Sequence, residues 1–575
     1  MLSTYTYPKF DYRRPPELGE ASPRRHPVVV VGAGPIGLAA AIDLAQRGLP
    51  VLLLDDDDTV SLGSRGVCYA KRTLEVLDRL GCGQRLVDKG VTWNVGRTFF
   101  DTDEVFHFNL QPEAGHQRPG MINLQQYYLE EFLVQRAGEL PNLDLRWRHK
   151  VIRVEPHGDG ATLQVETADG VFGVEADWLL VADGARSPIR RQLGLEIEGQ
   201  VFHDRFLIAD VVMQPPRPAQ GRSHAAESPL GGQHGVEDPG VGAGEWPAER
   251  WFWFDPPFHR GQSVLLHKQA DQVWRIDFQL GWNADPDEEK KPEKVIPRIR
   301  AMLGPEREFE LEWVSVYTFQ CRRMPQFRHG PVLFIGDAAH QVSPFGARGA
   351  NSGIQDADNL GWKLQAVIRG EAPAALLDTY ASERGAAADE NILNSTRSTD
   401  FITPKSATSK LFRNAVLGLA REHAFARALV NSGRLSVPTL ALDSPLNTPD
   451  DEAFEGWMVP GAPMDDAPVA VDGRPGWLLH EVAAGGGFTL LVFGGAPIEL
   501  PDTPVPLRLV RVGTVAAHGA WVDTEGLVAR RYDGRPGTCY LIRPDQHVVA
   551  RWRRFDASAV QAALARALGR LLTTA

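Results

Sequence analysis

The chain has 575 residues, enough for three or more domains at the usual size of about 100–200 residues each. Its 61 basic and 73 acidic residues give a formal net charge of −12, which argues against nucleic acid and against an anionic membrane surface as partners. Four cysteines without a CxxC pair or metal-ligand spacing argue against a disulfide framework and a metal site.

The N-terminal segment, residues 1–26, is rich in Pro and Arg and lacks the apolar run of a signal peptide. We predict that it is an extension on the protein surface. No apolar stretch of the chain approaches the length needed to span a bilayer. These features, with the cysteine pattern, favour a cytoplasmic protein without a membrane partner.

The first domain opens with an apolar run, residues 27–31, typical of a strand buried on both faces of a parallel sheet. A glycine-rich turn, a helix over 38–47 and a second apolar strand over 51–54 follow. This order of elements is the dinucleotide fingerprint: glycines permit a tight turn and close approach to a pyrophosphate, and an acid accepts from a ribose hydroxyl. The predicted nucleotide contacts are Gly32, Gly34, Pro35, Ile36, Gly37 and Asp55.

Further polar candidates follow in the same domain. Arg65 stands before an amphipathic helix and is a candidate phosphate ligand, although a surface arginine is the ordinary alternative. Gln126 opens the helix 127–137. After period-two strands, the apolar strand 178–182 ends at Asp183, at the edge where open α/β sheets bind ligands.

Residues 200–320 are rich in strands and aromatic side chains, which suits a sheet that presents rings to a flat substrate. The same aromatics are also compatible with an ordinary core. Residues 214–248, with many Gly, Pro and Ser, are predicted to be a long loop inserted between two strands.

A second ligand-binding pattern lies between residues 330 and 351. An apolar strand, 332–335, ends in an acidic turn, and a loop with glycines leads to a helix that begins near Asn351. The glycines allow backbone amides to approach a flat ligand, and the amides of the helix start carry partial positive charge. The predicted contacts are Gly336, Asp337, Pro344, Gly349, Ala350 and Asn351.

A composition shift rich in Pro and Asp near residues 438–451 marks a domain boundary, beyond which strands and a closing helix form a compact α/β unit. The predicted organisation is an N-terminal extension, two parts of one nucleotide-binding domain separated by the strand-rich domain, and a C-terminal domain. The boundaries are 1–26, 27–199, 200–320, 321–440 (with a helical segment) and 450–575.

Together, the Gly32-x-Gly34-x-x-Gly37 turn, Asp183-Gly184 and Gly336-Asp337-Ala338-Ala339-His340 resemble the motifs of the single-component (group A) FAD-dependent aromatic hydroxylases. The chain looks closest to phenol hydroxylase and hydroxyphenylpropionate hydroxylase, which carry a C-terminal thioredoxin-like domain. The resemblance implies a Rossmann-type FAD-binding domain with an inserted, mostly antiparallel substrate sheet and a thioredoxin-like α/β domain, here without CxxC.

The resemblance also implies roles for individual residues. Asp337 matches the family's acid at the ribityl chain, Arg65 and Gln126 match FAD contacts, and Asp183 marks the flavin site and the route of the nicotinamide cofactor. Two departures stand out. Val67 replaces the acid of the phenol hydroxylases, and Pro344-Phe345-Gly346-Ala347 stands where Pro-Pro-x-Gly-Gly is common.

The implied activity is a monooxygenase reaction of aromatic compound catabolism. NADH or NADPH reduces FAD, O2 adds at the flavin C4a carbon, and the hydroperoxide hydroxylates a small aromatic substrate, usually a phenol. A homodimer is expected from the resemblance alone. Candidates for the base that deprotonates the substrate are His203, Tyr69, His267 and Tyr317, each with a structural role as the plainer alternative.

Two other functions compete with this interpretation. A flavin-dependent halogenase would fit Trp251-Phe252-Trp253-Phe254 only superficially, and no lysine is placed to guide hypohalous acid. A non-catalytic flavin-binding or regulatory protein would use the C-terminal domain to dock a partner.

Overall fold

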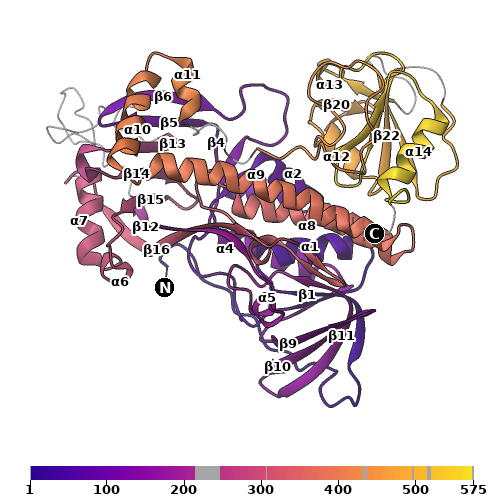
Figure 1. The fold of residues 1–575 in the computed structure, drawn as a ribbon, viewed down its shortest axis with the longest axis horizontal. Coiled ribbons are helices and arrows are strands. Elements are labelled where there is room, and N and C mark those ends of the chain that lie inside the picture. Colours follow the sequence, from indigo (N-terminus) through magenta and orange to yellow (C-terminus); the bar gives the residue numbers. More distant parts are fainter. Residues whose placement is uncertain are drawn as a thin grey trace.

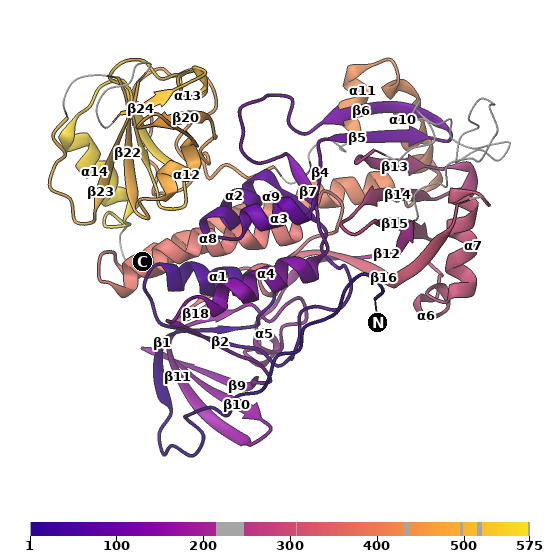
Figure 2. The same cartoon turned by 180° about the vertical axis from the view of Figure 1, so that it is seen from behind.

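Three large β-sheets organise the described part of the chain, and each belongs to a different part of the molecule (Figure 1, Figure 2). The computed structural model describes residues 2–213, 247–305, 307–430, 435, 437–494, 498–513 and 520–572, without the side chains of His203 and Ala520. The predicted insertion at 214–248 therefore lies almost wholly outside the described residues. Within the described ranges, no helix is both long and apolar enough to cross a membrane.

The first sheet has the strand order β17-β18-β11-β1-β2-β8, and β18, β11, β1, β2 and β8 run parallel. Val31, Val181 and Phe334 are register partners near the carboxyl ends of three adjacent strands, so the segments that follow them start from one edge. β9 and β10 add an antiparallel extension to β11. The strands are β1 Arg24–Val31, β2 Val51–Leu54, β8 Leu143–Arg146, β9 Lys150–His157, β10 Gly160–Thr167, β11 Gly170–Val181, β17 Arg328–His329 and β18 Val332–Phe334.

Helices α1 and α8 pack against each other, and their apolar residues join the core of this sheet. Figure 1 shows α8 and α9 side by side along the middle of the molecule, between the second sheet and the C-terminal domain. The helices of this part are α1 Pro35–Gln46, α2 Lys71–Arg79, α3 Gly83–Lys89, α4 Gln126–Gly138, α5 Pro188–Gln192, α8 Gly349–Ile368 and α9 Asp378–Ile402, and a small sheet joins β3 Cys68–Ala70, β7 Met121–Asn123 and β4 Val91–Trp93.

The second sheet has the order β19-β16-β12-β15-β14-β13-β5-β6 and is antiparallel except where β13 meets β5. Its last two strands in this order, β5 and β6, come from before residue 200, so the sheet draws on more of the chain than the predicted 200–320 segment. The elements are β5 Val95–Phe100, β6 Asp103–Asn109, β12 Glu198–Met213, β13 Arg250–Phe254, β14 Ser263–Lys268, β15 Val273–Leu280, β16 Phe309–Arg323, β19 His340–Gln341, α6 Pro286–Glu289 and α7 Pro292–Leu303.

The strand with the tryptophan-rich sequence divides its rings between two cores, because successive side chains of a strand point to opposite faces. Trp251 and Trp253 join the cluster that includes Val295 and Ile299 of α7. Phe252 and Phe254 join the opposite cluster, which α10 (Ala407–Ala420) and α11 (Ala424–Leu429) cover. The two tryptophans therefore serve as core, as the plainer interpretation has it.

The N-terminal extension packs on the first two parts of the molecule. The Tyr5 ring stacks on Tyr127 of α4 with ring centres 4.1 Å apart, and the hydroxyl of Tyr7 accepts from the backbone N–H of Gly63 at 2.8 Å. The side chain of Thr4 donates to Glu312 of β16 at 2.7 Å. The extension thus connects the nucleotide-binding part to the second sheet.

The C-terminal domain has a mixed sheet of order β21-β20-β24-β23-β22-β25-β26, in agreement with the predicted extra α/β unit. Its elements are β20 Pro468–Val471, β21 Arg474–Trp477, β22 Phe488–Phe493, β23 Leu507–Gly513, β24 Ala520–Asp523, β25 Cys539–Ile542, β26 Val548–Trp552, α12 Leu478–Ala483, α13 Leu527–Arg531 and α14 Ala557–Ala567.

A buried ionic network fastens this domain to the central helices. Glu383 of α9 accepts from Lys363 of α8 at 2.8 Å and from Arg543 of the C-terminal domain at 2.8 Å, and Arg543 also pairs with Asp545 at 2.6 Å. These four side chains are at most 3% exposed. Every charge in this network has a partner, and the network joins the C-terminal domain to α8 and α9.

Candidate active site

The structure brings the three predicted motifs together at the carboxyl edge of the first sheet. A methyl group on Gly32, which has φ +105°, would lie 2.4 Å from the carbonyl oxygen of Ala182, next to Asp183. A methyl on Gly37 would lie 1.9 Å from the carbonyl oxygen of Gly32. These two glycines are therefore required by contacts within the protein, since no larger residue fits there.

The third motif meets the first through an apolar contact. A methyl on Gly336 would lie 2.9 Å from the side chain of Ile36, and one on Gly353 of α8 would lie 2.7 Å from that same side chain. Ile36 thus sits between the turn after β18 and the first turns of α8.

Gly34 and Gly184 differ from these glycines, because no described protein atom lies within 4 Å of the position that a methyl group would take on either residue. Gly34 has an ordinary φ of −70°, so its backbone does not require glycine. The open space beside Gly34, next to the start of α1, fits the close approach of a pyrophosphate.

Asp55 follows β2 at the same edge. Its carboxylate accepts from the backbone N–H of Ala33, and its other oxygen accepts from the N–H of Asp57 at 2.9 Å. Burial raises the pKa of Asp55 to about 6, against the effect of these two hydrogen bonds. The carboxylate is therefore tied to the glycine-rich turn.

Two further acids stand at neighbouring strand ends. Asp183 accepts from the N–H of Ile189 at 3.2 Å through one oxygen, while its other oxygen is buried without a hydrogen-bond partner among the described residues. The side chain of Asp337 is accessible to solvent, and desolvation by the protein atoms around it raises its pKa. Both carboxyl groups have acceptor capacity that hydroxyl groups of a ligand would satisfy.

Behind Asp337 lies a buried charge network that sequence reasoning missed. Asp356 of α8 accepts from His340 at 2.6 Å, from Arg384 of α9 at 2.6 Å and from the backbone N–H of Gly336 at 3.1 Å. Burial alone would raise the pKa of Asp356, but His340 and Arg384 bring it below its ordinary range. The network fixes the turn that presents Asp337.

The loop 344–348 connects this turn to the start of α8. Ala347 adopts φ +53°, a conformation that favours glycine, at one of the positions where this chain departs from the family pattern. The Phe345 ring packs edge-on against Phe206 and Phe319 of the second sheet, with ring centres 5.1 and 5.2 Å apart. The loop is thus the contact between the nucleotide-binding part and the aromatic face of the sheet.

Asn351 in the first turn of α8 is buried and joins three segments. Its side-chain oxygen accepts from the N–H of Ala70 at 2.8 Å, and its amide donates to the carbonyls of Cys68, at 2.9 Å, and of Ala347. The side chain is therefore occupied within the protein, and its role is to position β3 and the loop against the helix start. The first backbone amides of α8 have no intrahelical acceptor, as at any helix start.

Arg65 and Gln126 take different positions. The Arg65 side chain is exposed, with no hydrogen bond or ion pair to another described residue. Gln126 accepts from the N–H of Gly66 at 2.9 Å and donates to Glu130 at 2.7 Å. Gln126 thus orders the segment that carries Arg65, while Arg65 is free to bind a ligand.

The four base candidates separate by environment. Tyr69 is fully buried and donates to the carbonyl of Gly66 at 3.4 Å, and burial raises the pKa of Tyr69 and of the partly buried Tyr317. Burial, with nearby arginines, lowers the pKa of His267 well below its ordinary value. The side chain of His203 lies outside the described residues. The pKa of each of these three groups is thus shifted away from the neutral range in which a general base works best.

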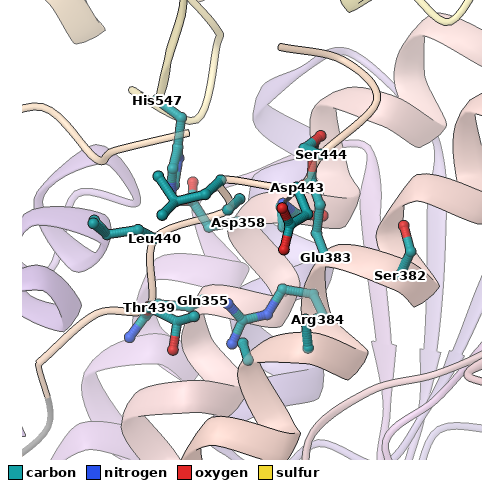
Figure 3. A pocket seen from close by; sticks show the side chains of 15 residues that line it. Gln355, Asp358, Ser382, Glu383, Arg384, Thr439, Leu440, Asp443, Ser444 and His547 are labelled. Carbon is teal, nitrogen blue, oxygen red and sulfur yellow. Dashed lines mark hydrogen bonds between the residues drawn. The ribbon is translucent and has the colours of Figure 1, made fainter. Parts of the chain in front are cut away.

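A polar pocket of about 170 Å³, lined in part by Arg384, lies where α8 and α9 meet the C-terminal domain (Figure 3). Side chains of α8, α9, the 439–444 segment and His547 surround it. Its two buried acids are paired, since Glu383 binds Lys363 and Arg543 and Asp358 binds Arg79, so we assign the pocket to the domain junction.

Comparison with known proteins identifies the family of the chain. The family model described as "FAD binding domain" matches residues 25–395, which is more than half of the chain. The chain belongs to this family. It is an FAD-dependent monooxygenase, and the resemblance to group A flavoprotein monooxygenases is confirmed.

Curated relatives cover this monooxygenase to different extents. A 6-methylpretetramide 4-monooxygenase of Streptomyces rimosus is 30% identical over 569 residues, which covers 93% of the chain and 92% of the relative. A 3-(3-hydroxy-phenyl)propionate/3-hydroxycinnamic acid hydroxylase of Mycolicibacterium smegmatis is 28% identical over 63% of the chain and 59% of the relative. The similarity to the first relative includes the C-terminal domain.

The flavin-dependent monooxygenase PieE, solved with FAD and substrate, has the same fold as this monooxygenase, with a TM-score of 0.77 over 96% of this chain and 100% of that one at 23% identity. The predicted fold class is therefore confirmed. The family match to residues 25–395 makes FAD the cofactor of the enzyme, as the motif resemblance implied.

Proposed function

We propose that this monooxygenase hydroxylates a phenolic aromatic substrate with electrons from NADH or NADPH. The observation that carries the proposal is the contact of Phe345, in the loop before α8, with Phe206 and Phe319 on the second sheet. This contact puts a face of aromatic rings beside the loop 344–348, which we predict to contact the flavin and call the flavin loop. The names of the relatives, a 6-methylpretetramide monooxygenase and a hydroxyphenylpropionate hydroxylase, support an aromatic substrate.

The residues at the strand ends would hold FAD in a definite way. The pyrophosphate would lie along Gly34 and the start of α1, Asp55 would accept from the ribose, and Asp337 would accept from the ribityl chain. The remaining predicted contacts are Gly32, Pro35, Ile36, Gly37, Arg65, Gln126, Asp183, Gly336, Pro344, Gly349, Ala350 and Asn351. Once reduced, FAD supplies the activation of O2.

The chain's own groups would then perform three tasks. The free amides of Gly349 to Asn351 would stabilise negative charge beside the helix start. The rings of Phe206, Phe319 and Phe345 would keep water away from the reacting oxygen. The backbone around Ala347 would set the position of the loop between these two groups.

The test is a purified protein offered a panel of phenols with NADH or NADPH. We expect a yellow protein whose NAD(P)H oxidation is stimulated by a phenol, with a product one oxygen atom heavier by mass spectrometry. A colourless protein that does not take up FAD, or the absence of stimulation by any aromatic, would contradict the proposal. A halogenated product in the presence of chloride or bromide would favour the alternative class.

A further inference from the structure

A row of charged and polar side chains crosses one face of the second sheet, the face that carries Phe252 and Phe254. Arg250 of β13 is the register partner of His267 of β14, and His267 is the partner of Arg275 of β15. Because register partners on antiparallel strands point to the same face, the three side chains lie side by side. Phe252 and Phe254 lie on this face as well, two and four residues after Arg250.

Arg250 is 9% exposed and has no hydrogen bond or ion pair to any described residue. Its guanidinium lies over the Phe252 ring, 5.6 Å from the ring centre. The Nε2 atom of His267 is also buried without a partner among the described residues. Buried cations in proteins are almost always paired, so an arginine and an imidazole left side by side in this state indicate a missing anionic partner.

The remaining charged groups around the row do not supply that partner. Asp277 is committed to Arg275, whose Nε donates to it at 3.0 Å. Asp210 of β12, the register partner of Arg275, accepts from Ser64, and burial raises its pKa to about 7. Cys68 faces His267 at 3.8 Å, and burial raises the pKa of its thiol, so it stays neutral. The local balance is therefore positive.

The row is close to the proposed flavin site. The backbone carbonyl of Cys68 accepts from Asn351 at 2.9 Å, and the side chain of Cys68 packs in a small cluster together with Ala347 of the flavin loop. One residue, Cys68, thus separates His267 from the start of α8.

We propose that Arg250 and His267 bind an anionic oxygen of the aromatic substrate, so that the enzyme selects substrates carrying an ionised phenol, enol or carboxylate. The inference rests on the proposed function and names the substrate class for that site. It also removes the need for one of the described base candidates, because the positive guanidinium of Arg250 favours the ionised form of a bound phenol. Arg250 and His267 would be specificity-determining residues.

The test uses the FAD-loaded enzyme and 4-nitrophenol, whose ionised form has its own visible absorption band. We expect the bound probe to ionise at lower pH than the free probe, by about one pKa unit or more, which is tenfold in preference. Arg250→Met should abolish this shift and weaken binding of the ionised probe by about 10-fold to 100-fold. An unshifted or raised pKa of the bound probe, or an unchanged shift in Arg250→Met, would overturn the proposal.

A second measurement separates binding from structure. Removing an unpaired buried charge should raise the Tm of the ligand-free Arg250→Met variant, whereas loss of a structural arginine would lower it. His267→Gln, which keeps a hydrogen-bond donor, should retain part of the shift. The control is Arg97→Gln on β5, whose side chain pairs with Glu249 at 2.6 Å on the opposite face. A shift lost equally in the control would contradict a specific role for Arg250.

Competition experiments distinguish a carboxylate from a phenolate as the anionic group that binds. Displacement of 4-nitrophenolate by benzoate, with no displacement by benzamide, supports a carboxylate, whereas displacement by phenols alone supports a phenolate. Equal displacement by benzoate and benzamide would overturn the proposal. If neutral aromatics stimulate NAD(P)H oxidation in the wild type and in Arg250→Met alike, the hydroxylase function stands and only the anion subsite fails.

Discussion

The glycines of the Gly32-x-Gly34-x-x-Gly37 turn have different structural roles, although the sequence motif does not distinguish them. Gly37 faces the carbonyl oxygen of Gly32 at a distance that no side chain tolerates, while Gly34 faces open space. Gly37→Ala should therefore lower the free energy of unfolding by about 3 kcal/mol or more, because the backbone must move. Gly34→Ala should leave the Tm of the FAD-free protein unchanged and weaken FAD binding by about tenfold or more.

Thermal unfolding of the FAD-free protein and fluorescence titration with FAD measure the two effects separately. The pair controls itself, since both variants add one methyl group within four residues of each other. If Gly34→Ala bound FAD as tightly as the wild type, the pyrophosphate would not lie along this glycine.

The buried carboxyl of Asp55 should make the affinity for FAD depend on pH. Burial raises the pKa of this carboxyl to about 6 in the folded chain, so it is largely protonated below that pH. A ribose hydroxyl donates to the ionised form, and FAD affinity should thus rise as pH increases through 6 and level off above it. Well below pH 6 the change should approach about tenfold per pH unit. Asp55→Asn should bind FAD more weakly above pH 7 and lose this pH dependence. Parallel pH curves for both proteins, measured by FAD fluorescence between pH 5 and 8, would count against the role.

At the scale of elements, the start of α8 is the point that the rest of the site is built around. Asn351 is buried and holds Ala70, Cys68 and Ala347 there. Asn351→Asp keeps the bond from Ala70 but places a negative charge where we propose that the reduced flavin's charge is stabilised. The reduction potential of the bound flavin should fall by about 30 mV or more, which is tenfold for a two-electron couple.

The matched control is Gln355→Glu, one turn further along the same helix. Its charge lies beyond the first turn, where the effect of the helix start has faded, so the potential should barely change. Equal potentials in Asn351→Asp and the wild type, measured by dye-coupled reduction, would show that the flavin is not stabilised by this helix start.

The arrangement of strands also shows which parts of the site could be predicted from the sequence alone. The meeting of the Gly32, Asp183 and Gly336 motifs was predictable, because each follows an apolar strand and parallel strands end at a common edge. The row from Arg250 to Arg275 was not, since it depends on which strands pair and in which register. Gln126 shows a different limit: the motif predicts an FAD contact, but its amide already binds Gly66 and Glu130.

At the scale of the whole molecule, the C-terminal domain is attached through charges far apart in the sequence. Arg543 lies 160 residues from Glu383, which explains why no local pattern revealed the pair. Trp362 of α8 and Phe488 of β22 add an apolar contact, with ring centres 5.6 Å apart. α8 begins at the proposed flavin site, and the ionic network contacts a later turn of this helix through Lys363. The C-terminal domain therefore stabilises the position of the helix that follows the loop 344–348.

Glu383→Gln tests this stabilisation. The change leaves Lys363 and Arg543 buried without a full counter-charge, and it should lower the free energy of unfolding by about 3–5 kcal/mol. The control is Asp389→Asn on the same helix, where an exposed pair with Arg323 is worth about 1 kcal/mol or less. Limited proteolysis should cut Glu383→Gln, but not the control, in the 439–444 segment that leads to the C-terminal domain. Equal resistance of the two variants, together with equal Tm values, would mean that the domain is held by its apolar contacts and that the ionic network is dispensable.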